Sequence, residues 1–160
     1  MSGAASNTAP MQREVTISRV IAAPRDLVFK AWTDPAHLAR WWGPHGFTNP
    51  VCEVDARVGG KLYIVMRGPD GTDYPMRGVF TEVLAPLRLV FTNFPVDADD
   101  RPLLEGHTTV TFAEEGGKTR VTVVMRATGL APAAASMLEG MEMGWTQTID
   151  RLESYATSLA

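Results

Sequence analysis

The sequence has little cysteine, little net charge and no long apolar run. Cys52 is the single cysteine among 160 residues, which excludes an internal disulfide and any Cys-x-x-Cys metal or redox motif. The 15 basic and 18 acidic side chains give a net charge of -3, so neither nucleic acid nor an anionic membrane is expected as a partner. No apolar stretch approaches the roughly 20 residues that a membrane helix needs. We therefore expect an intracellular, cytoplasmic protein.

Recognisable catalytic motifs are missing as well. The sequence contains no Gly-x-Ser-x-Gly elbow, no His-Glu-x-x-His pair and no glycine-rich dinucleotide turn. A Gly-Lys-Thr triplet at Gly117 imitates the end of a phosphate-binding loop, but Phe112 stands where that motif needs glycine. The histidines lie far apart and beside expected surface: His37, His45 and His107. From these residues we assign no catalytic group, no cofactor and no metal ligand.

The composition is that of one globular domain. A hydrophobic content of 45% is enough to bury a core in a chain of this length. Residues 1–12 are small and polar, without a basic start or an apolar run, and we expect a disordered tail there rather than a signal peptide. Residues 13–160 are expected to form a single domain.

The most regular pattern in the chain predicts one long helix over residues 132–159. Apolar residues recur there at steps of three or four and so share one helix face: Leu138, Met141, Trp145, Ile149, Leu152, Ala156 and Leu159. Gly140 and Gly144 lie inside this helix on one side, each costing about 1 kcal/mol relative to alanine. They either relieve crowding beside Trp145 or let a strand, a loop or a ligand approach the helix backbone. The apolar face needs a surface to pack on, and the rest of the chain must supply it.

Runs with β-strand character occupy most of the remaining sequence. The first, residues 14–22, is followed by two short helices within residues 23–41. Six more runs are separated by turns: 47–55, 61–67, 76–84, 87–93, 104–113 and 118–128. Short turns between sequential strands make an antiparallel meander, which can bury the long helix only by curling around it, with the small helices closing one end. The predicted fold class is α+β, a seven-stranded curved antiparallel sheet wrapped around a long C-terminal helix.

Several motifs, in their order along the chain, resemble a known family. They are Ala23-Pro24 with Val28-Phe29, Trp32-Thr33-Asp34-Pro35, Leu38-x-x-Trp41-Trp42-Gly43-Pro44, Asp55-x-Arg57-x-Gly59-Gly60, the Pro69-Asp70-Gly71 turn, and Gly144-Trp145 ahead of Leu152. Together they resemble the bacterial relatives of the activator of Hsp90 ATPase, within the START and Bet v-type helix-grip superfamily (SRPBCC). The resemblance implies the helix-grip fold with a cavity between sheet and helix. It implies no single chemistry, because helix-grip folds carry many functions.

Aromatic, aliphatic and methionine side chains are expected to line the implied pocket. Trp41 and Trp42 each have about 200 Å² to bury; either both belong to the core, or one lies in the core and the other at the pocket. Methionines suit cavities for varied apolar ligands, although they are also ordinary core residues. The expected pocket residues are Trp41, Phe47, Ile64, Met66, Phe91, Val123, Met125, Met141 and Trp145. Arg67, Arg77 and His107 are candidate polar anchors, and strand alternation does not decide which way these three face.

The leading functional hypothesis is a binding protein for a small hydrophobic or aromatic molecule, without assigned catalysis. One alternative is a chaperone-associated interaction module, which the resemblance implies. An Hsp90-type chaperone is the less favoured partner, because the eukaryotic cochaperone carries a further domain where this chain has a short tail. Another alternative is a cyclase- or hydrolase-like enzyme that uses an acid or a histidine in the pocket. A homodimer is compatible with bacterial domains of this kind, although no particular residue argues for it.

Overall fold

The computed structural model describes residues 11–160, which include one antiparallel sheet of seven strands. The strands are β1 (Gln12–Ile21), β2 (Thr48–Val54), β3 (Lys61–Arg67), β4 (Asp73–Leu84), β5 (Arg88–Pro95), β6 (Leu104–Glu115) and β7 (Lys118–Gly129). Their order in the sheet is β1-β7-β6-β5-β4-β3-β2, so the chain returns strand by strand until β7 pairs with β1. The predicted seven-stranded antiparallel sheet is confirmed. A disordered tail was predicted for residues 1–12. Residues 1–10 of it lie outside the described residues, and Gln12 belongs to β1.

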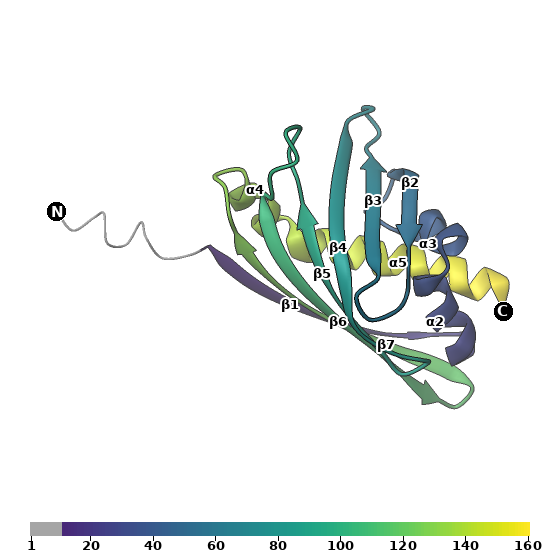
Figure 1. Cartoon of the computed structure of the whole chain (residues 1–160). Helices are drawn as coiled ribbons and strands as arrows, with labels where there is room; N and C mark the ends of the chain where they lie inside the picture. The colour runs from purple at the N-terminus through teal and green to yellow at the C-terminus, as the bar shows by residue number, and fades with distance from the viewer. Residues whose placement is uncertain (1–10) are drawn as a thin grey trace.

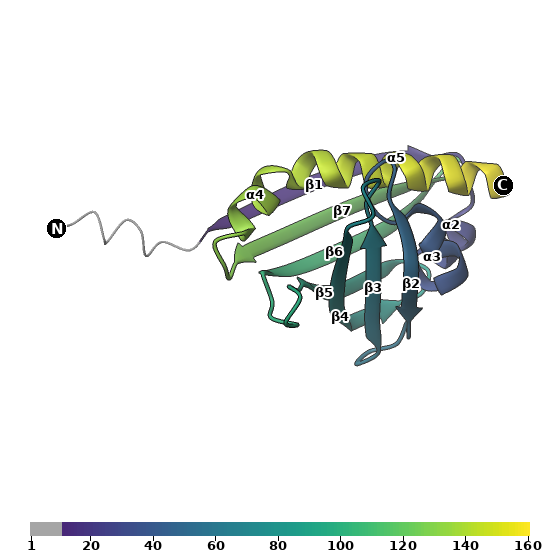
Figure 2. The ribbon, with the colours of Figure 1, turned by 90° about the horizontal axis from the view of Figure 1, so that it is seen from above.

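Four helices lie against this sheet within the described chain. They are α2 (Arg25–Thr33), α3 (Pro35–Trp41), α4 (Ala134–Glu139) and α5 (Met141–Leu159). The curved sheet passes across α5, and α2 and α3 sit together at one end, beside β2 (Figure 1). Seen from above, α5 runs along β1 (Figure 2). Asp34 separates the two short helices, because its side chain accepts a hydrogen bond from the backbone N–H of Ala36 and so caps α3.

Strand alternation decides which side chains meet the helices. On β7 the apolar alternate residues are all buried: Val121, Val123, Met125 and Ala127. The buried side chains form two clusters, one packed around α2 and α3 and one around α4. Trp145 on α5 packs against both clusters, so it lies where the two halves of the interior meet.

The single helix predicted for residues 132–159 is interrupted at Gly140, and this part of the prediction is wrong. Gly140 has φ -87° and ψ 0°, outside helical geometry, and separates α4 from α5. The guanidinium of Arg13 on β1 donates to the carbonyl oxygens of Leu138 and Glu139, at 2.8 and 3.0 Å. In a continuous helix those oxygens would accept from backbone N–H groups four residues later. Arg13 therefore ends α4, and glycine tolerates the change of direction that follows.

Candidate ligand-binding site

A cavity of about 880 Å³ lies between α4, the first half of α5 and the sheet. Its other walls come from the turn between α3 and β2, from β3 to β7 and from the loop between β5 and β6. Pockets that hold small organic ligands have volumes of roughly 300–1,000 Å³. The cavity is therefore large enough for a molecule of several rings.

Two indole rings form one wall of this cavity. Trp42 and Trp145 both line it, with their ring centroids 5.5 Å apart and nearly perpendicular. They belong to one aromatic cluster with Trp32, which stacks on Trp145 at 6.5 Å and meets Trp41 edge-on at 4.7 Å. The sequence contains four tryptophans, so all of them lie in this cluster. A ligand in the cavity would change the surroundings of two of these rings.

Flexible thioether side chains supply much of the remaining wall. Five of the eight methionines line the cavity: Met66, Met76, Met125, Met137 and Met141. Methionine has three rotatable bonds and a polarisable sulfur, so it fits apolar groups of different shape. Met143, on the same helix as Met141, is 69% exposed. On α5, therefore, Met141 faces the cavity and Met143 faces solvent.

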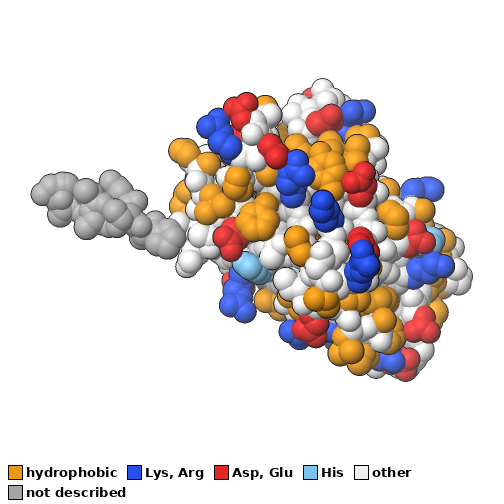
Figure 3. Space-filling model, viewed as in Figure 1, with side chains coloured by type: hydrophobic (Ala, Val, Ile, Leu, Met, Phe, Trp, Pro, Cys, Tyr) orange, Lys and Arg blue, Asp and Glu red, His pale blue; other side chains and the backbone are white. Residues whose placement is uncertain are grey.

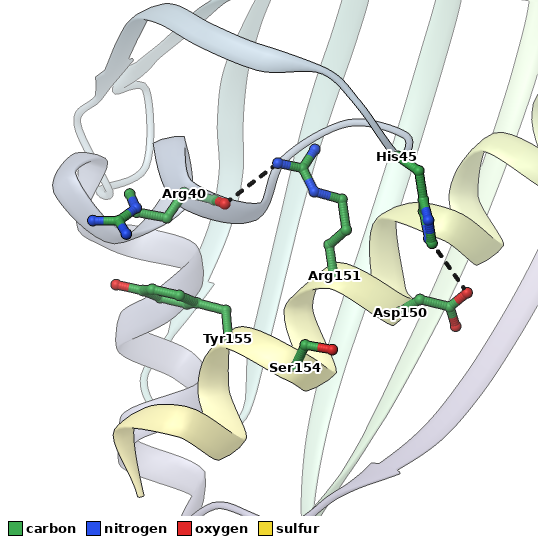
Figure 4. Close-up of a pocket in the computed structure, with 6 residues that line it drawn as sticks. All are labelled: Arg40, His45, Asp150, Arg151, Ser154 and Tyr155. Atoms are coloured by element: carbon green, nitrogen blue, oxygen red, sulfur yellow. Dashed lines mark hydrogen bonds and ion pairs between the residues drawn. The ribbon is translucent and has the colours of Figure 1, made fainter.

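The turn that carries Trp42 is tied to α5 by Arg151. Its Nη1 donates to the carbonyl oxygens of Trp42, Gly43 and Pro44 at 3.0, 2.9 and 3.0 Å. Burial lowers the pKa of this guanidinium. In the close-up, Arg151 reaches from α5 toward the turn, and His45 points down to Asp150 beside it (Figure 4). The groove of about 350 Å³ drawn there lies beside the same turn, and Arg151 holds that turn in place as a wall of the larger cavity.

Carboxylates that line the cavity are held in the ionised state. Hydrogen bonds from Arg67, at 2.7 and 3.1 Å, lower the pKa of Asp73. Backbone hydrogen bonds from Arg101 and Asp99 lower the pKa of Asp97. The two side chains are 44% and 32% exposed, so they lie near solvent. At neutral pH both are anions, and neither is suited to donate a proton.

Two buried polar residues face the cavity from opposite sides. Asn93 on β5 and Thr148 on α5 both line it, and their exposed fractions are 6% and 5%. The hydroxyl of Thr148 donates to the carbonyl oxygen of Gly144 at 2.8 Å. The amide oxygen of Asn93 accepts from the hydroxyl of Thr108 at 2.9 Å. The interior of the cavity is thus apolar with two embedded polar groups.

Five of the nine predicted pocket residues line the cavity, and four do not. Those that line it are Phe47, Met66, Met125, Met141 and Trp145. Trp41 is fully buried, and its indole N–H donates a hydrogen bond to the carbonyl oxygen of Ala31, which fixes the ring between α2 and α3. Its neighbour Trp42 lines the cavity instead. The other three lie in the packed cluster around α2 and α3: Ile64, Phe91 and Val123.

For Ile64, Phe91 and Val123 the prediction missed the cavity by the same distance along the strand. Each lies on the expected face of the sheet, but the cavity is lined by the residue two positions later on the same strand. Met66 replaces Ile64, Asn93 replaces Phe91 and Met125 replaces Val123. Alternation identifies the inward face, whereas the place along the strand depends on where α2 and α3 fill the interior.

The predicted polar anchors lie outside the cavity. Arg67 pairs with Asp73, Arg77 with Asp100 at 2.7 Å, and His107 with Glu105 at 2.9 Å. On the face of the sheet that Figure 3 shows, side chains of both charge signs are mixed with scattered apolar ones. Arg67 and Arg77 are exposed members of ion pairs, His107 is an exposed side chain hydrogen-bonded to Glu105, and none of the three lines the cavity.

Asn93 and Thr148 are the two buried polar lining residues that the sequence prediction missed, and Asn93 could have been found. A signal for it was present, because Leu89 and Phe91 are apolar residues at the inward positions of β5 and Asn93 follows at the same spacing. An amide at an inward position is a buried polar group that needs a partner. The loop residues Asp97 and Ala98 also line the cavity, and no strand or helix pattern covers them.

The curved sheet, the C-terminal helix and the cavity between them define a helix-grip protein. Residues 22–157 match the family described as "Activator of Hsp90 ATPase homolog 1-like protein", and the chain belongs to this family. Membership indicates a domain of the ligand-binding or activator type. The comparison with curated proteins gave no match. In the described part of the chain, no helix is both long enough and apolar enough to cross a membrane.

Solved bacterial structures resemble the chain along most of its length. A protein from Nitrosomonas europaea is 29% identical, with a TM-score of 0.72 and coverage of 91% of this chain and 94% of its own. One from Chromobacterium violaceum is 28% identical, with a TM-score of 0.75 and coverages of 90% and 96%. A protein from Silicibacter pomeroyi named AHSA1 is also 28% identical, with a TM-score of 0.73 and coverages of 92% and 97%. The family assignment from sequence motifs is confirmed.

Proposed function

We propose that this protein binds a small hydrophobic or aromatic molecule in the cavity between the sheet and α5. The observation that carries the proposal is the cavity of about 880 Å³, walled by two indole rings and five methionines. Burying apolar surface contributes about 25 cal/mol per Å², so a ligand of several rings would gain enough to offset the cost of association. The family's helix-grip architecture supports the same reading.

The chemistry of the wall supports binding rather than catalysis. Among the described residues that line the cavity there is no histidine and no cysteine. Its carboxylates, Asp73 and Asp97, are held as anions by their hydrogen bonds. General acid catalysis needs a group whose pKa lies near the working pH, and a lowered carboxylate pKa moves away from it. The polar groups of the wall are better suited to orient a ligand.

Ligand capture tests the proposal directly. The protein is purified, examined by native mass spectrometry for a retained small molecule, and screened by thermal shift against a panel of hydrophobic metabolites. We expect a stoichiometric mass increase or a concentration-dependent rise in melting temperature for a subset of apolar compounds. Tryptophan emission should respond to the same compounds, because Trp42 and Trp145 line the cavity.

A cavity-filling variant controls for binding elsewhere. A side chain at Gly144 would have its Cβ 4.0 Å from the nearest atom of Pro44, so Gly144→Leu should occupy cavity space. Met143→Leu, on the exposed side of α5, is the matched control. Binding that Gly144→Leu abolishes and Met143→Leu leaves intact supports the proposal. If both variants bind as the parent does, or if no compound binds while an Hsp90-type chaperone does, the proposal is wrong.

A further inference from the structure

The side-chain amide of Asn93 offers the cavity a hydrogen-bond donor that has no partner among the described residues. The residue is 6% exposed and lines the cavity. Its Oδ1 accepts from the Thr108 hydroxyl at 2.9 Å. Among the described residues, no acceptor forms a hydrogen bond with its Nδ2. A buried amide normally finds partners for both ends, so this nitrogen is available to something inside the cavity.

The strand next to Asn93 leaves room for the amide. Asn93 stands opposite Gly106 in the pairing of β5 with β6. A Cβ at Gly106 would lie 2.6 Å from Nδ2 of Asn93 and 2.8 Å from Cε of Met125. The amide nitrogen and this cavity-lining methyl group therefore flank the same point above Gly106. Any larger residue at Gly106 would push the amide out of its place.

Thr108 sets the direction of the amide. Its side chain is fully buried, and its hydroxyl hydrogen bond holds the oxygen of Asn93 on the side of β6. The two ends of an amide differ, because one accepts and the other donates. With the oxygen engaged, the cavity meets the donor end. The matching ligand group is thus an acceptor.

The charges around the cavity restrict the acceptor to a neutral one. The described lining residues include no lysine, arginine or histidine, and their ionisable side chains with a lowered pKa are Asp73 and Asp97. A bound carboxylate would lack a counter-ion inside, because the guanidiniums beside the cavity, those of Arg67 and Arg101, are already paired with Asp73 and Asp97. A carbonyl oxygen on an apolar skeleton needs no counter-ion.

We propose that Asn93 is the polar anchor of the cavity and that the ligand is an uncharged apolar molecule carrying a carbonyl-type oxygen. This inference rests on the proposed binding function and specifies its ligand class. Thr108 is a positioning residue, since it acts through the amide of Asn93. Thr148 on the opposite wall already donates its proton to Gly144 and does not compete for the same oxygen.

Matched probes test the anchor at pH 7. 2-Acetylnaphthalene and 2-ethylnaphthalene have nearly the same shape, and only the first carries a carbonyl oxygen; 2-naphthoate adds a negative charge. Dissociation constants are measured by calorimetry or by tryptophan emission. We expect the ketone to bind about 3- to 10-fold more tightly than the hydrocarbon, the usual value of one hydrogen bond, and more tightly than the carboxylate. The infrared carbonyl stretch of the bound ketone should move to lower wavenumber.

The control variant combines Asn93→Leu with Thr108→Val. Removing both partners leaves no lone polar group in the core, and its folding is verified by thermal unfolding. In this variant the preference for the ketone and the infrared shift should disappear, while the hydrocarbon still binds. Equal binding of ketone and hydrocarbon to the parent would overturn the role of Asn93 and leave the binding function standing. Tighter binding of naphthoate would overturn the uncharged class. Failure of every probe to bind the parent would count against the binding function and the inference together.

Discussion

Cys52 lies half-buried on β2, packed against the core around α2 and α3. Burial raises the pKa of its thiol from an ordinary value of 9.0 to about 11, and the charge of the adjacent Glu53 adds to the shift. The thiolate is the reactive form of cysteine. At neutral pH this side chain therefore behaves as a small apolar group.

Alkylation of Cys52 should depend on pH in a way that reports this burial. Because the pKa of this thiol is higher in the folded protein than in the unfolded chain, protonation of Cys52 favours the folded state. Its contribution to the free energy of unfolding is fully present below pH 9.0 and is lost as the pH rises through about 11. We expect the rate of modification by iodoacetamide to rise with a midpoint near pH 11 in the folded protein and near 9.0 in denaturant. Cys52→Ser is the blank for modification elsewhere. A folded midpoint at or below 9.0 would contradict the burial.

At the scale of elements, the same residue of α5, Gly144, affects both the stability of the helix and the volume of the cavity. Gly140 and Gly144 both line the cavity, so the two glycines let the cavity reach the helix backbone. This favours ligand approach over the relief of crowding beside Trp145. Gly144 lies inside α5, where glycine costs about 1 kcal/mol relative to alanine. The helix has thus kept a destabilising residue at the cavity.

Gly144→Ala should raise stability and weaken binding. The new Cβ would be 4.0 Å from Pro44, an ordinary contact, so we expect an increase of about 0.5–1 kcal/mol in the free energy of unfolding. The methyl group takes cavity volume, and affinity for large probes should fall. Denaturant unfolding and probe titration measure the two effects. A loss of stability would mean that the turn at Pro44 packs more tightly on α5 than the contact distance indicates.

The turn between α3 and β2 depends on Arg151. Replacing this residue with alanine leaves the carbonyl oxygens of Trp42, Gly43 and Pro44 without their shared donor. Hydrogen bonds to a charged group contribute about 1.5–3 kcal/mol, so Arg151→Ala should lower the free energy of unfolding by about 2 kcal/mol. Affinity for cavity probes should fall as well, because Trp42 is a wall residue.

Arg40→Ala is the matched control for Arg151. Arg40 lies beside the same surface groove (Figure 4), but its guanidinium meets the ring of Tyr155 at 6.0 Å and the structure gives it no hydrogen bond to the turn. We expect its replacement to change stability by less than about 1 kcal/mol and to leave probe affinity unchanged. Equal effects of the two replacements would show that the surface groove, rather than the turn, is what matters.

At the scale of the whole molecule, the cavity is lined by residues of two packed clusters. One surrounds α2 and α3, and the other surrounds α4. Trp145 is the side chain of α5 that touches both and also lines the cavity. A molecule that fills the space would contact both clusters, and a site built from both exists only in the folded state.

Ligand binding should therefore stabilise the entire fold. A ligand at about 100 times its dissociation constant adds about 2.7 kcal/mol, which corresponds to a rise of roughly 5–10 °C in the melting temperature of a domain of this size. A concentration series of any probe found by mass spectrometry, followed by circular dichroism, measures it. Stabilisation that saturates far below this value would indicate that the ligand also binds unfolded chains or lies on the surface.

The amino-acid pattern by itself determined the fold of this protein. Alternation of apolar and polar residues along the strands, and the apolar stripe of α5, depend on neighbours a few residues apart, so the sheet, its inward face and the helix that it wraps could be predicted. The family followed from the order of the motifs along the chain. The large apolar area of Trp41 and Trp42 likewise placed both residues at the interior, although it did not decide which of the two rings lines the cavity.

Only the tertiary structure decided where the interior is solid and where it is open. Helices α2 and α3 fill one end of the curved sheet, so Ile64, Phe91 and Val123 are core while residues two positions farther along line the cavity. Arg13 reaches the last carbonyl oxygens of α4 from another element and divides the predicted helix. Contacts of this kind join residues more than 100 positions apart, and no local period records them.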